Sequence, residues 1–484
     1  MEDSNKNKVY KGMKSQTIVT IVMGILEVIY FAIMSRLLSK EDFGYFAVII
    51  AVTAILQTLT EAGLGSSVIQ KKDPSAKFIS TAFTLSILTG TFFCIFLLFT
   101  AGFFSNLMVE SDYLKSAFML MSIPLFLSNI NSIARAMMMR KLDFLKFGIY
   151  QTIAYIVSSA IGIVMAYNGY GFYAIITVAI TNQLCTTIIL YGINRFSPGL
   201  CLNKNMAKEI FSYGGWLTGA AIVRSIIEQL DKLILSRWLS VSMLGAFNRP
   251  SGFLSQITTK INGIFDTILF PILSGIQDDE ERIRSAYIKA TILVVTCSLI
   301  LTYLFILGSK LCIEIFFGSS WLNLLGILQI LSISVVFLGY GRIADCFMRS
   351  LGIVKTYFCN RLIACIITVI CLYYGCKLGG MTGAAIGLTL SRVFDVVIKI
   401  VLLKNKIRIN RLQLYGEIFK SNTIPSIAFI FSFYLISHIT LGSMVSCIIF
   451  CGIVISTAVF FPNLYGNILV NNIIRPVKSK LNIK

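Results

Sequence analysis

The chain has 484 residues, of which 56% are hydrophobic and only 13% are charged, and its mean hydropathy is +0.81. Since soluble domains carry about 25% charged residues, this composition argues against a soluble enzyme, a nucleic-acid-binding domain and a disordered chain. It is typical of a polytopic membrane protein, because one span needs about 20 apolar residues and the apolar content suffices for about fourteen spans. The net charge of +20 then indicates a basic cytoplasmic face.

Apolar runs bounded by charged residues, Gly, Pro or Asn predict fourteen transmembrane helices. The first six lie at residues 17–35, 43–69, 78–100, 115–138, 147–167 and 171–192. Six more lie at 210–237, 241–270, 287–309, 322–348, 356–376 and 381–403, and the last two lie at 422–440 and 442–461. All are expected to be helices, because an open strand would leave its backbone polar groups unsatisfied in lipid.

The distribution of basic residues predicts the orientation of these spans. With the N-terminus in the cytoplasm, 28 of the 42 Lys and Arg residues fall in the N-terminus, the inner loops and the tail, and 6 fall in outer loops. This bias follows the positive-inside rule, so both termini are predicted to be cytoplasmic. The polar N-terminus lacks a cleavable apolar core, so no signal peptide is expected.

The two groups of six predicted spans carry an internal repeat. Ser35-Arg36-Leu37-Leu38-Ser39, followed by Gly44 and Phe46, corresponds at an offset of 201 to Ser236-Arg237-Trp238-Leu239-Ser240, followed by Gly245 and Phe247. Further on, Met139-Arg140 corresponds to Met348-Arg349, and the turn Gly169-Tyr170-Gly171 to Gly380-Met381-Thr382-Gly383. Because six spans are an even number, the halves have the same orientation, and a site is expected between them near the midplane.

The predicted fold class is therefore an all-α integral membrane protein of about 14 transmembrane helices, with two six-helix lobes related by a parallel internal repeat and two additional C-terminal helices. We expect the N-terminal lobe at residues 1–193, a cytoplasmic linker at 194–209 and the C-terminal lobe at 210–404. A basic cytoplasmic linker at 405–421 precedes the two extra helices and the basic tail at 422–484.

Fifteen charged residues fall within the predicted spans, eight basic and seven acidic. Each costs about 2.5–3.5 kcal/mol at a helix centre, so none is expected to face lipid. The basic ones are Arg135, Arg224, Lys232, Arg249, Lys260, Arg342, Arg392 and Lys399, and the acidic ones are Glu27, Glu61, Glu228, Asp231, Asp266, Asp345 and Asp395.

The predicted helix 210–237 carries a charged stripe. Arg224, Glu228, Asp231 and Lys232 lie at i, i+4, i+7 and i+8, which places them on one face. Two interpretations stay open. The stripe faces a cavity or the other half of the protein, or its members form a salt-bridge ladder at spacing i, i+4.

Other charges leave similar alternatives. The groups Arg392, Asp395 and Lys399, and Arg342 with Asp345, either pair within their own helices or face a cavity. Lys399 and Arg135 lie near predicted span ends, where snorkelling is expected. Glu27 and Glu61 have no nearby basic residue and are expected to be protonated, or bound to a cation or an arginine of another helix. Beside Arg249, Pro250 predicts either a break that lines a cavity or a simple kink.

Motifs for soluble chemistry are missing from the sequence. There is no G-x-x-x-x-G-K-[ST], G-x-S-x-G or H-E-x-x-H. His438 is the only histidine, and most of the 12 cysteines lie in apolar runs, where they are expected to be small buried side chains. Together with the short loops, this predicts translocation rather than catalysis, with no catalytic residue and no metal site.

Several segments, taken in order, resemble bacterial polysaccharide flippases. They are Ser35–Gly44 (SRLLSKEDFG), Glu61–Gln70 (EAGLGSSVIQ), Gln229–Leu235 (QLDKLIL), Phe270–Ser274 (FPILS) and Gln277-Asp278-Asp279. These flippases, the Wzx-type O-antigen flippases among them, form the polysaccharide-transporter branch of the multidrug/oligosaccharidyl-lipid/polysaccharide exporter superfamily. The resemblance covers most of residues 15–400, and no signature marks the last two spans.

The resemblance implies a two-lobed, MATE-like fold that alternates between inward- and outward-facing states. It implies transfer of an oligosaccharide linked to undecaprenyl diphosphate from the cytoplasmic to the outer leaflet of the bacterial plasma (inner) membrane. Typical cargo is O-antigen for lipopolysaccharide, capsule, exopolysaccharide or teichuronic acid units. Glycosyltransferases, a polymerase and a chain-length regulator are the implied partners besides the lipid-linked substrate and the bilayer.

A diphosphate that crosses the membrane needs cations in a polar cavity, and the guanidinium fork of arginine matches phosphate oxygens. The candidates for binding the diphosphate and glycan are Arg224, Arg249, Lys260, Arg342 and Arg392. Candidates for coupling to H⁺ or Na⁺, or for lining the cavity, are Glu27, Glu61, Glu228 and Asp231. No other cofactor is expected.

Three alternative functions remain open at this point. A multidrug cation exporter and a peptidoglycan-precursor flippase belong to the same superfamily. A membrane-embedded polysaccharide polymerase is a third, and the short outer loops argue against it.

Overall fold

The computed structural model describes residues 2–466 and 470, except 62, 72, 109–110, 142, 194–195, 197, 277–278, 408–410 and 439–441. For some of these residues the structure describes the backbone but not the side chain. They are residues 2–17, 61, 70, 144, 213–217, 220, 259–272, 274–275, 354, 404–407, 411–413, 438 and 463. The described residues form helices joined by short connections, with no strand among them. They pack into two compact units, residues 1–246 and residues 247–484.

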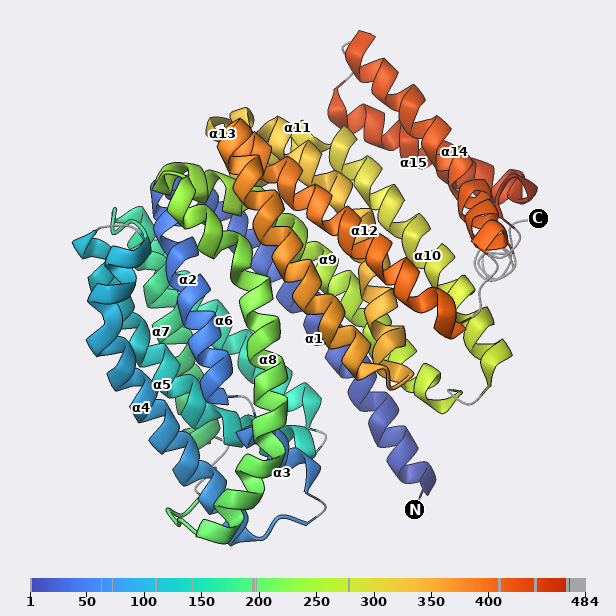
Figure 1. Ribbon diagram of the computed structural model, residues 1–484. Helices are drawn as coiled ribbons and strands as arrows, with labels where there is room; N and C mark the ends of the chain where they lie inside the picture. The colour runs from blue at the N-terminus through green and yellow to red at the C-terminus, as the bar shows by residue number, and fades with distance from the viewer. Residues whose placement is uncertain are drawn as a thin grey trace. The chain divides into compact units, whose positions relative to one another are not determined.

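Unit 1 contains seven long helices and one short one. They are α1 (Glu2–Leu37), α2 (Lys40–Glu61), α3 (Leu64–Gln70), α4 (Ala76–Met108), α5 (Asp112–Arg140), α6 (Phe144–Tyr167), α7 (Tyr173–Thr187) and α8 (Lys204–Trp238). A π-helical segment, Ile188–Ile193, extends α7. Within the unit, α4 packs against α5, α6 against α7 and α1, and α8 against α2, as Figure 1 shows.

The predicted span 43–69 is divided into two helices. α2 ends at Glu61 and α3 begins at Leu64, with Gly63 between them at φ 92°. Glycine adopts this left-handed conformation without the steric cost that a Cβ would add. Arg140, at the end of α5, donates from Nη1 to the carbonyl oxygens of Val68 (3.1 Å) and Ile69 (3.3 Å). It thereby satisfies terminal carbonyls that have no partner within α3.

Unit 2 begins within α9 (Val241–Gly275). It continues with α10 (Glu280–Leu307), α11 (Ser309–Cys312), α12 (Leu325–Ser350), α13 (Val354–Ile407), α14 (Arg411–His438) and α15 (Ser443–Phe460). Shorter segments are π-helical at Ile313–Phe317 and 3₁₀-helical at Ser319–Leu324 and Pro462–Leu464. α14 lies against α10 and α15, at one flank of the unit in Figure 1.

The long helix α13 turns back on itself at two glycines. Gly379 (φ −142°, ψ 18°) and Gly380 (φ 55°, ψ −131°) interrupt it at the turn that the sequence predicts. The two halves then meet closely, since a Cβ built on Gly375 would lie 2.3 Å from the carbonyl oxygen of Gly383. α13 therefore supplies two passes.

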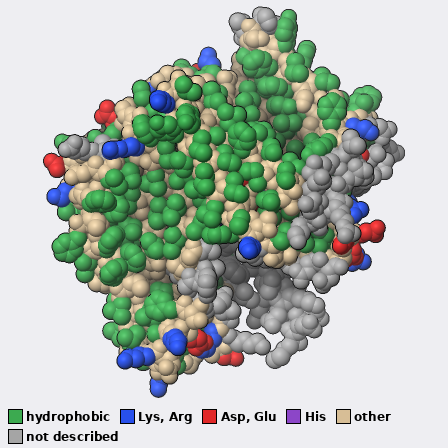
Figure 2. Space-filling view, viewed as in Figure 1, with side chains coloured by type: hydrophobic (Ala, Val, Ile, Leu, Met, Phe, Trp, Pro, Cys, Tyr) green, Lys and Arg blue, Asp and Glu red, His purple; other side chains and the backbone are tan. Residues whose placement is uncertain are grey.

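The long helices account for the predicted number of spans. Ten segments of the described chain are long and apolar enough to cross a membrane, and one of them, residues 355–403, contains both halves of α13. With α8, α9 and α14, which are 35, 35 and 28 residues long, they make about fourteen passes. Figure 2 shows hydrophobic side chains over most of the visible face, and charged side chains mainly toward its margins. The predicted all-α fold class is confirmed.

Two sequence-based expectations concern the middle of the chain. α9 continues as a helix through Pro250, so of the two predicted alternatives, a break or a simple kink, the break is not present. Packing divides the chain after Ala246, and α8 lies in unit 1 against α2. The six-helix lobes rest on the internal repeat rather than on packing, and they remain a prediction.

Candidate functional site

The middle of α8 carries an exposed pair of charges. The Arg224 Nε atom lies 3.7 Å from Glu228 Oε1, and the two side chains are 67% and 56% exposed. Arg224 is about 20 Å along the helix axis from the Trp238 end and about 30 Å from the Lys204 end, at 1.5 Å per residue. A charged pair at this depth is stable only where it meets water or a polar ligand.

Two contacts attach α8 to the rest of unit 1. Ser225 Oγ donates to the carbonyl oxygen of Ala54 on α2 (3.3 Å). Near the start of α8, Glu209 accepts two hydrogen bonds from Lys71 Nζ at 2.7 and 2.8 Å. Since Ser225 is buried while its neighbour Arg224 is exposed, the packing of α8 on α2 turns Arg224 away from α2.

The predicted ladder along α8 forms only in part. The Arg224–Glu228 pair is present, whereas Lys232 Nζ donates to Gln229 Oε1 at 2.7 Å. The carboxylate of Asp231 accepts from the backbone N–H of Lys232 at 2.9 Å, and both side chains are half-buried. The stripe is therefore two local groups rather than a continuous ion-pair ladder.

The structure describes the side chain of only one of the two predicted acids on α1 and α2. Glu27 is half-buried on α1, within electrostatic reach of Tyr155 on α6. The ring of Tyr155 packs edge-on against Tyr30 of α1, with centroids 6.0 Å apart. The side chain of Glu61 lies outside the described residues.

Amide side chains that the sequence analysis did not single out form a polar network inside unit 1. Asn131 of α5 donates from Nδ2 to Gln183 Oε1 (3.2 Å) and accepts from Thr187 Oγ1 (3.1 Å). The Tyr191 hydroxyl donates to the carbonyl oxygen of Ile130 at 2.7 Å. These contacts join α5 to α7. Their only sequence signal is the presence of Asn and Gln in apolar runs, where an unpaired amide is costly.

Unit 2 holds the remaining predicted cations. Arg249 on α9 and Arg342 on α12 are half-buried. Arg392 on α13 is also half-buried and donates to the hydroxyl of Ser334 on α12. The side chain of Lys260 lies outside the described residues. The spacing of Arg392 and Asp395 suggested a pair within α13. Arg392 instead contacts Ser334 of α12.

A second set of charges is buried between α12 and the two halves of α13. Lys399 Nζ lies 3.0 Å from Asp345 Oδ1 and 2.7 Å from Asp395 Oδ2. Arg361 Nη2 lies 2.5 Å from Asp345 Oδ2, and Asn360 Nδ2 donates to Asp395 Oδ1 at 3.1 Å. We call Asp345, Arg361, Asp395 and Lys399 the buried ion network.

The buried ion network contains two positive and two negative side chains, so it is neutral. Lys399 is 1% exposed and the Asp345 side chain 6% exposed. Lys399 also donates to the carbonyl oxygen of Gly341 at 3.3 Å. Charges this deeply buried are tolerated when each has good partners, because the mutual attraction then offsets the lost hydration.

The sequence-based expectations for these residues were wrong in two respects. Lys399 does not snorkel, because its ammonium group lies between two carboxylates. Asp345 pairs with Lys399 and with Arg361, a residue that the sequence analysis did not single out, rather than with Arg342. Asp395 and Lys399 do pair at i, i+4 as their spacing suggested.

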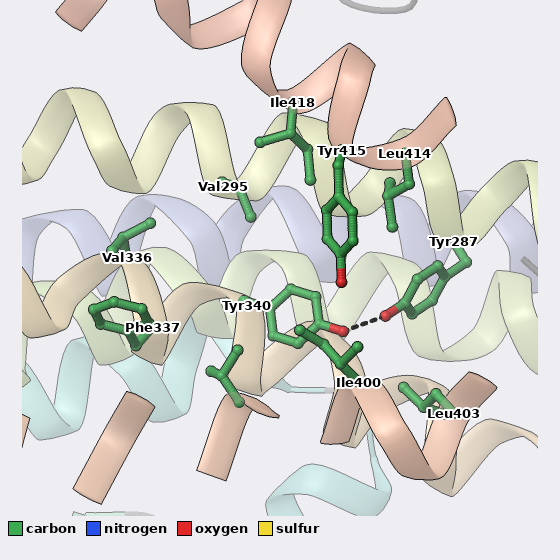
Figure 3. A pocket seen from close by; sticks show the side chains of 11 residues that line it. Tyr287, Val295, Val336, Phe337, Tyr340, Ile400, Leu403, Leu414, Tyr415 and Ile418 are labelled. Carbon is green, nitrogen blue, oxygen red and sulfur yellow. Dashed lines mark hydrogen bonds between the residues drawn. The ribbon is translucent and has the colours of Figure 1, made fainter. Parts of the chain in front are cut away.

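Unit 2 also contains an apolar cavity of about 220 Å³ between α10, α12, α13 and α14 (Figure 3). The hydroxyls of Tyr287 and Tyr340 lie 2.6 Å apart in its wall, and the hydroxyl of Tyr415 points toward them. The other lining side chains are Val, Ile, Leu and Phe. None of the predicted site residues whose side chains the structure describes lines this cavity.

A family profile described as "Polysaccharide biosynthesis protein" matches residues 33–325, which is more than half of the chain. The chain belongs to this family. The predicted resemblance is thereby confirmed, and the matched residues 33–325 include every segment quoted above.

Named relatives of the chain are found in several bacteria. The lipopolysaccharide biosynthesis protein WzxC of Escherichia coli (strain K12) is 22% identical over 401 residues, which cover 82% of this chain and 80% of the relative. The succinoglycan biosynthesis transport protein ExoT of Rhizobium meliloti (strain 1021) is 24% identical over 376 residues, covering 75% of this chain and 74% of the relative.

Solved structures establish the fold. The lipid II flippase MurJ in its inward closed conformation superposes with a TM-score of 0.73 at 15% identity, covering 93% of this chain and 99% of MurJ. An inward-facing multidrug resistance MATE family transporter superposes with a TM-score of 0.65 at 12% identity, covering 81% of this chain and 98% of the transporter. The chain therefore has the MATE-like fold.

Proposed function

We propose that this protein flips an oligosaccharide linked to undecaprenyl diphosphate from the cytoplasmic to the outer leaflet of the bacterial plasma membrane, during the biosynthesis of a surface polysaccharide. Family membership, the similarity to the lipopolysaccharide biosynthesis protein WzxC and the similarity to the succinoglycan biosynthesis transport protein ExoT support transport in polysaccharide biosynthesis. The fold likeness to a lipid II flippase is consistent with a lipid-linked cargo. The protein acts as a transporter and not as an enzyme.

The observation that carries the proposal is the exposed Arg224–Glu228 pair in the middle of α8. A sugar diphosphate cannot cross about 30 Å of hydrocarbon without polar contacts. Arg224 offers a guanidinium group whose attachment to Glu228 is loose enough, at 3.7 Å, to be exchanged for phosphate oxygens. Arg249, Lys260, Arg342 and Arg392 are further candidates for the diphosphate and glycan.

The orientation of the protein is part of this proposal. The bias of Lys and Arg toward one side supports cytoplasmic N- and C-termini. The two six-helix lobes of the repeat would then alternate between inward- and outward-facing states, while α14 and α15 lie outside the repeat. Glu27, Glu61, Glu228 and Asp231 are candidates for coupling to H⁺ or Na⁺. Partner glycosyltransferases, a polymerase and a chain-length regulator would act before and after the flip.

Deletion of the gene tests the proposed function. Lipid-linked oligosaccharide should accumulate on the cytoplasmic leaflet, as measured by its protection from a membrane-impermeant glycosidase or lectin. If the units reach the outer leaflet and stay unpolymerised, the flippase proposal fails and a polymerase is favoured. If surface polysaccharide is normal while lipid II accumulates inside, the chain is a peptidoglycan-precursor flippase instead.

The variant Arg224→Ala tests the candidate site within the deletion strain. Surface polysaccharide should fall at least about tenfold, because a charge-assisted hydrogen bond contributes about 1.5–3 kcal/mol. Abundance in the membrane should stay normal. Arg237→Ala is the matched control, since Arg237 is exposed at the end of the same helix. Wild-type polysaccharide in Arg224→Ala would exclude Arg224 from the site.

A further inference from the structure

Two glycines lie where the start of α2 and the first turn of α9 come into backbone contact, both within unit 1. A Cβ built on Gly44 would lie 2.0 Å from the carbonyl oxygen of Val241. A Cβ built on Gly245 would lie 1.8 Å from the carbonyl oxygen of Lys40 and 2.6 Å from the backbone nitrogen of Gly44. Backbone therefore meets backbone, which only glycine permits at such a crossing.

This contact is reciprocal in the internal repeat. The offset of 201 residues pairs Gly44 with Gly245 and Lys40 with Val241. Gly44 touches the counterpart of Lys40, and Gly245 touches Lys40 itself. Such a reciprocal contact, in which each partner touches the residue equivalent to its partner's neighbour in the other half, is typical of a two-fold relation. The two glycines therefore make equivalent contacts in the two turns that the repeat relates.

The α2 side of this contact is anchored to its own half of the repeat. Asp42 Oδ2 accepts hydrogen bonds from the backbone N–H (2.9 Å) and the hydroxyl (2.7 Å) of Ser39. Its other oxygen, Oδ1, accepts from the backbone N–H of Phe172 at 2.8 Å. Asp42 thus fastens the start of α2 to the α6–α7 turn, where Gly171 has φ 55° and a Cβ would lie 2.7 Å from Asp42 Oδ1.

In the part of the chain that the structure describes, the start of α9 has no anchor equivalent to Asp42. The residue at the position of Asp42, 201 residues later, is Met243. Its backbone N–H donates to Ser240 Oγ at 3.3 Å, which caps the helix locally but ties it to no other turn. The two halves of the repeat therefore share the glycine contact, but only the start of α2 is hydrogen-bonded to a turn between other helices.

We infer that the reciprocal contact of Gly44 with Gly245 is the closure of the outer side of the transport path, and that the first turn of α9 moves away from an anchored α2 when the path opens outward. The inference rests on the proposed function and orientation, which put the start of α2 and of α9 at the outer side. A backbone contact between the starts of α2 and α9 leaves no room there for cargo to pass. Glycine lets it close without a gap.

A cysteine reporter on α2 tests this closure. Ala47 is 0% exposed and lies one turn further along α2, about 5 Å from Gly44 along the axis. In Ala47→Cys, labelling of residue 47 by a membrane-impermeant maleimide from outside the cell is read by peptide mass spectrometry, so that the 12 native cysteines do not interfere.

Adding Gly44→Ala or Gly245→Ala should raise labelling of residue 47 about tenfold or more, because overpacking the contact shifts the population toward the open form. Gly252→Ala is the matched control, since it lies on the same helix α9 and a Cβ there would meet nothing within 4 Å. Labelling in the two contact variants that stays at the level of Gly252→Ala overturns the closure.

A second measurement leaves both glycines in place. Ala47→Cys alone is labelled in cells that make the lipid-linked oligosaccharide and in cells that lack its first glycosyltransferase. The closure predicts labelling several-fold faster when substrate is supplied, and equal rates overturn it. Labelling of the glycine variants requires no substrate, so its result does not depend on the outcome of the gene deletion that tests the flippase proposal. This keeps failure of the closure distinguishable from failure of the proposed function.

Discussion

The Arg224–Glu228 pair on α8 and the buried ion network of unit 2 are both built from charges inside membrane-spanning helices, and both include partners at spacing i, i+4. Their surroundings differ. Arg224 and Glu228 are more than half exposed and 3.7 Å apart, whereas Lys399 is 1% exposed and within 3.0 Å of two carboxylates. The same local pattern thus produces an accessible pair in one unit and a structural cross-link in the other.

The difference separates two uses of intramembrane charge. A loosely paired, accessible cation is free to exchange its partner for a ligand. A cation held between two carboxylates stabilises the packing of three helical segments and is not available to a ligand. Mutations in the buried ion network should therefore lower the stability of the protein. Mutations of the α8 pair should lower transport and leave stability unchanged.

The largest effect is expected for Lys399→Met. The substitution leaves Asp345 and Asp395 facing each other without their shared ammonium group. Breaking a buried ion pair by removing one partner costs about 3–5 kcal/mol, so the midpoint of thermal unfolding of the purified protein in detergent should fall sharply. Lys310→Met, at an exposed position of α11, is the matched control and should shift stability by less than about 0.5 kcal/mol. An unchanged midpoint for Lys399→Met would remove the distinction between the two groups.

An intermediate effect is expected when the whole network is made uncharged. The variant carries Asp345→Asn, Arg361→Met, Asp395→Asn and Lys399→Met together. Because no unpaired charge remains, it should recover about half or more of the stability lost in Lys399→Met. Surface polysaccharide is then measured in the deletion strain. A stable variant that transports confirms a structural role for the network. A stable variant that does not transport would show that the network takes part in the transport cycle, which contradicts the distinction from the α8 pair.

The smallest effect on stability is expected for Glu228→Gln. Exposed pairs at i, i+4 contribute only about 0.3–0.5 kcal/mol, so its thermal midpoint should lie close to that of the unmodified protein. The neutral amide keeps the size of the side chain while freeing Arg224 from its counter-ion. A drop comparable to that of Lys399→Met would show that the α8 pair is also structural.

The sequence predicts the helices of this protein well because hydrophobic runs are local. Predicted spans 78–100 and 147–167 correspond to α4 and α6, and the turn near residue 380 corresponds to Gly379 and Gly380 of α13. The sequence analysis missed the break after α2, because Gly63 lies within the predicted span 43–69 and its positive φ leaves no mark in the hydropathy pattern.

The candidate site was less accessible to sequence reasoning. Spacing along one helix identifies Arg224–Glu228 and Asp395–Lys399 as pairs but says nothing about which face meets solvent. Asp345 and Lys399 are 54 residues apart, and Asp345 and Arg361 are 16 apart across a turn. Such partners become visible only once α12 and both halves of α13 are packed together.

The sequence by itself determined the fold class and the family, and it predicted the membrane orientation, because hydropathy, charge bias and the quoted motifs are properties of local segments. The repeat was also visible in the sequence, as matched residues at an offset of 201. Only the tertiary structure decided which charges are exposed and which are locked, and that Gly44 and Gly245 touch. The physical reason is that burial and backbone contact depend on the packing of helices far apart in the chain, which no local pattern specifies.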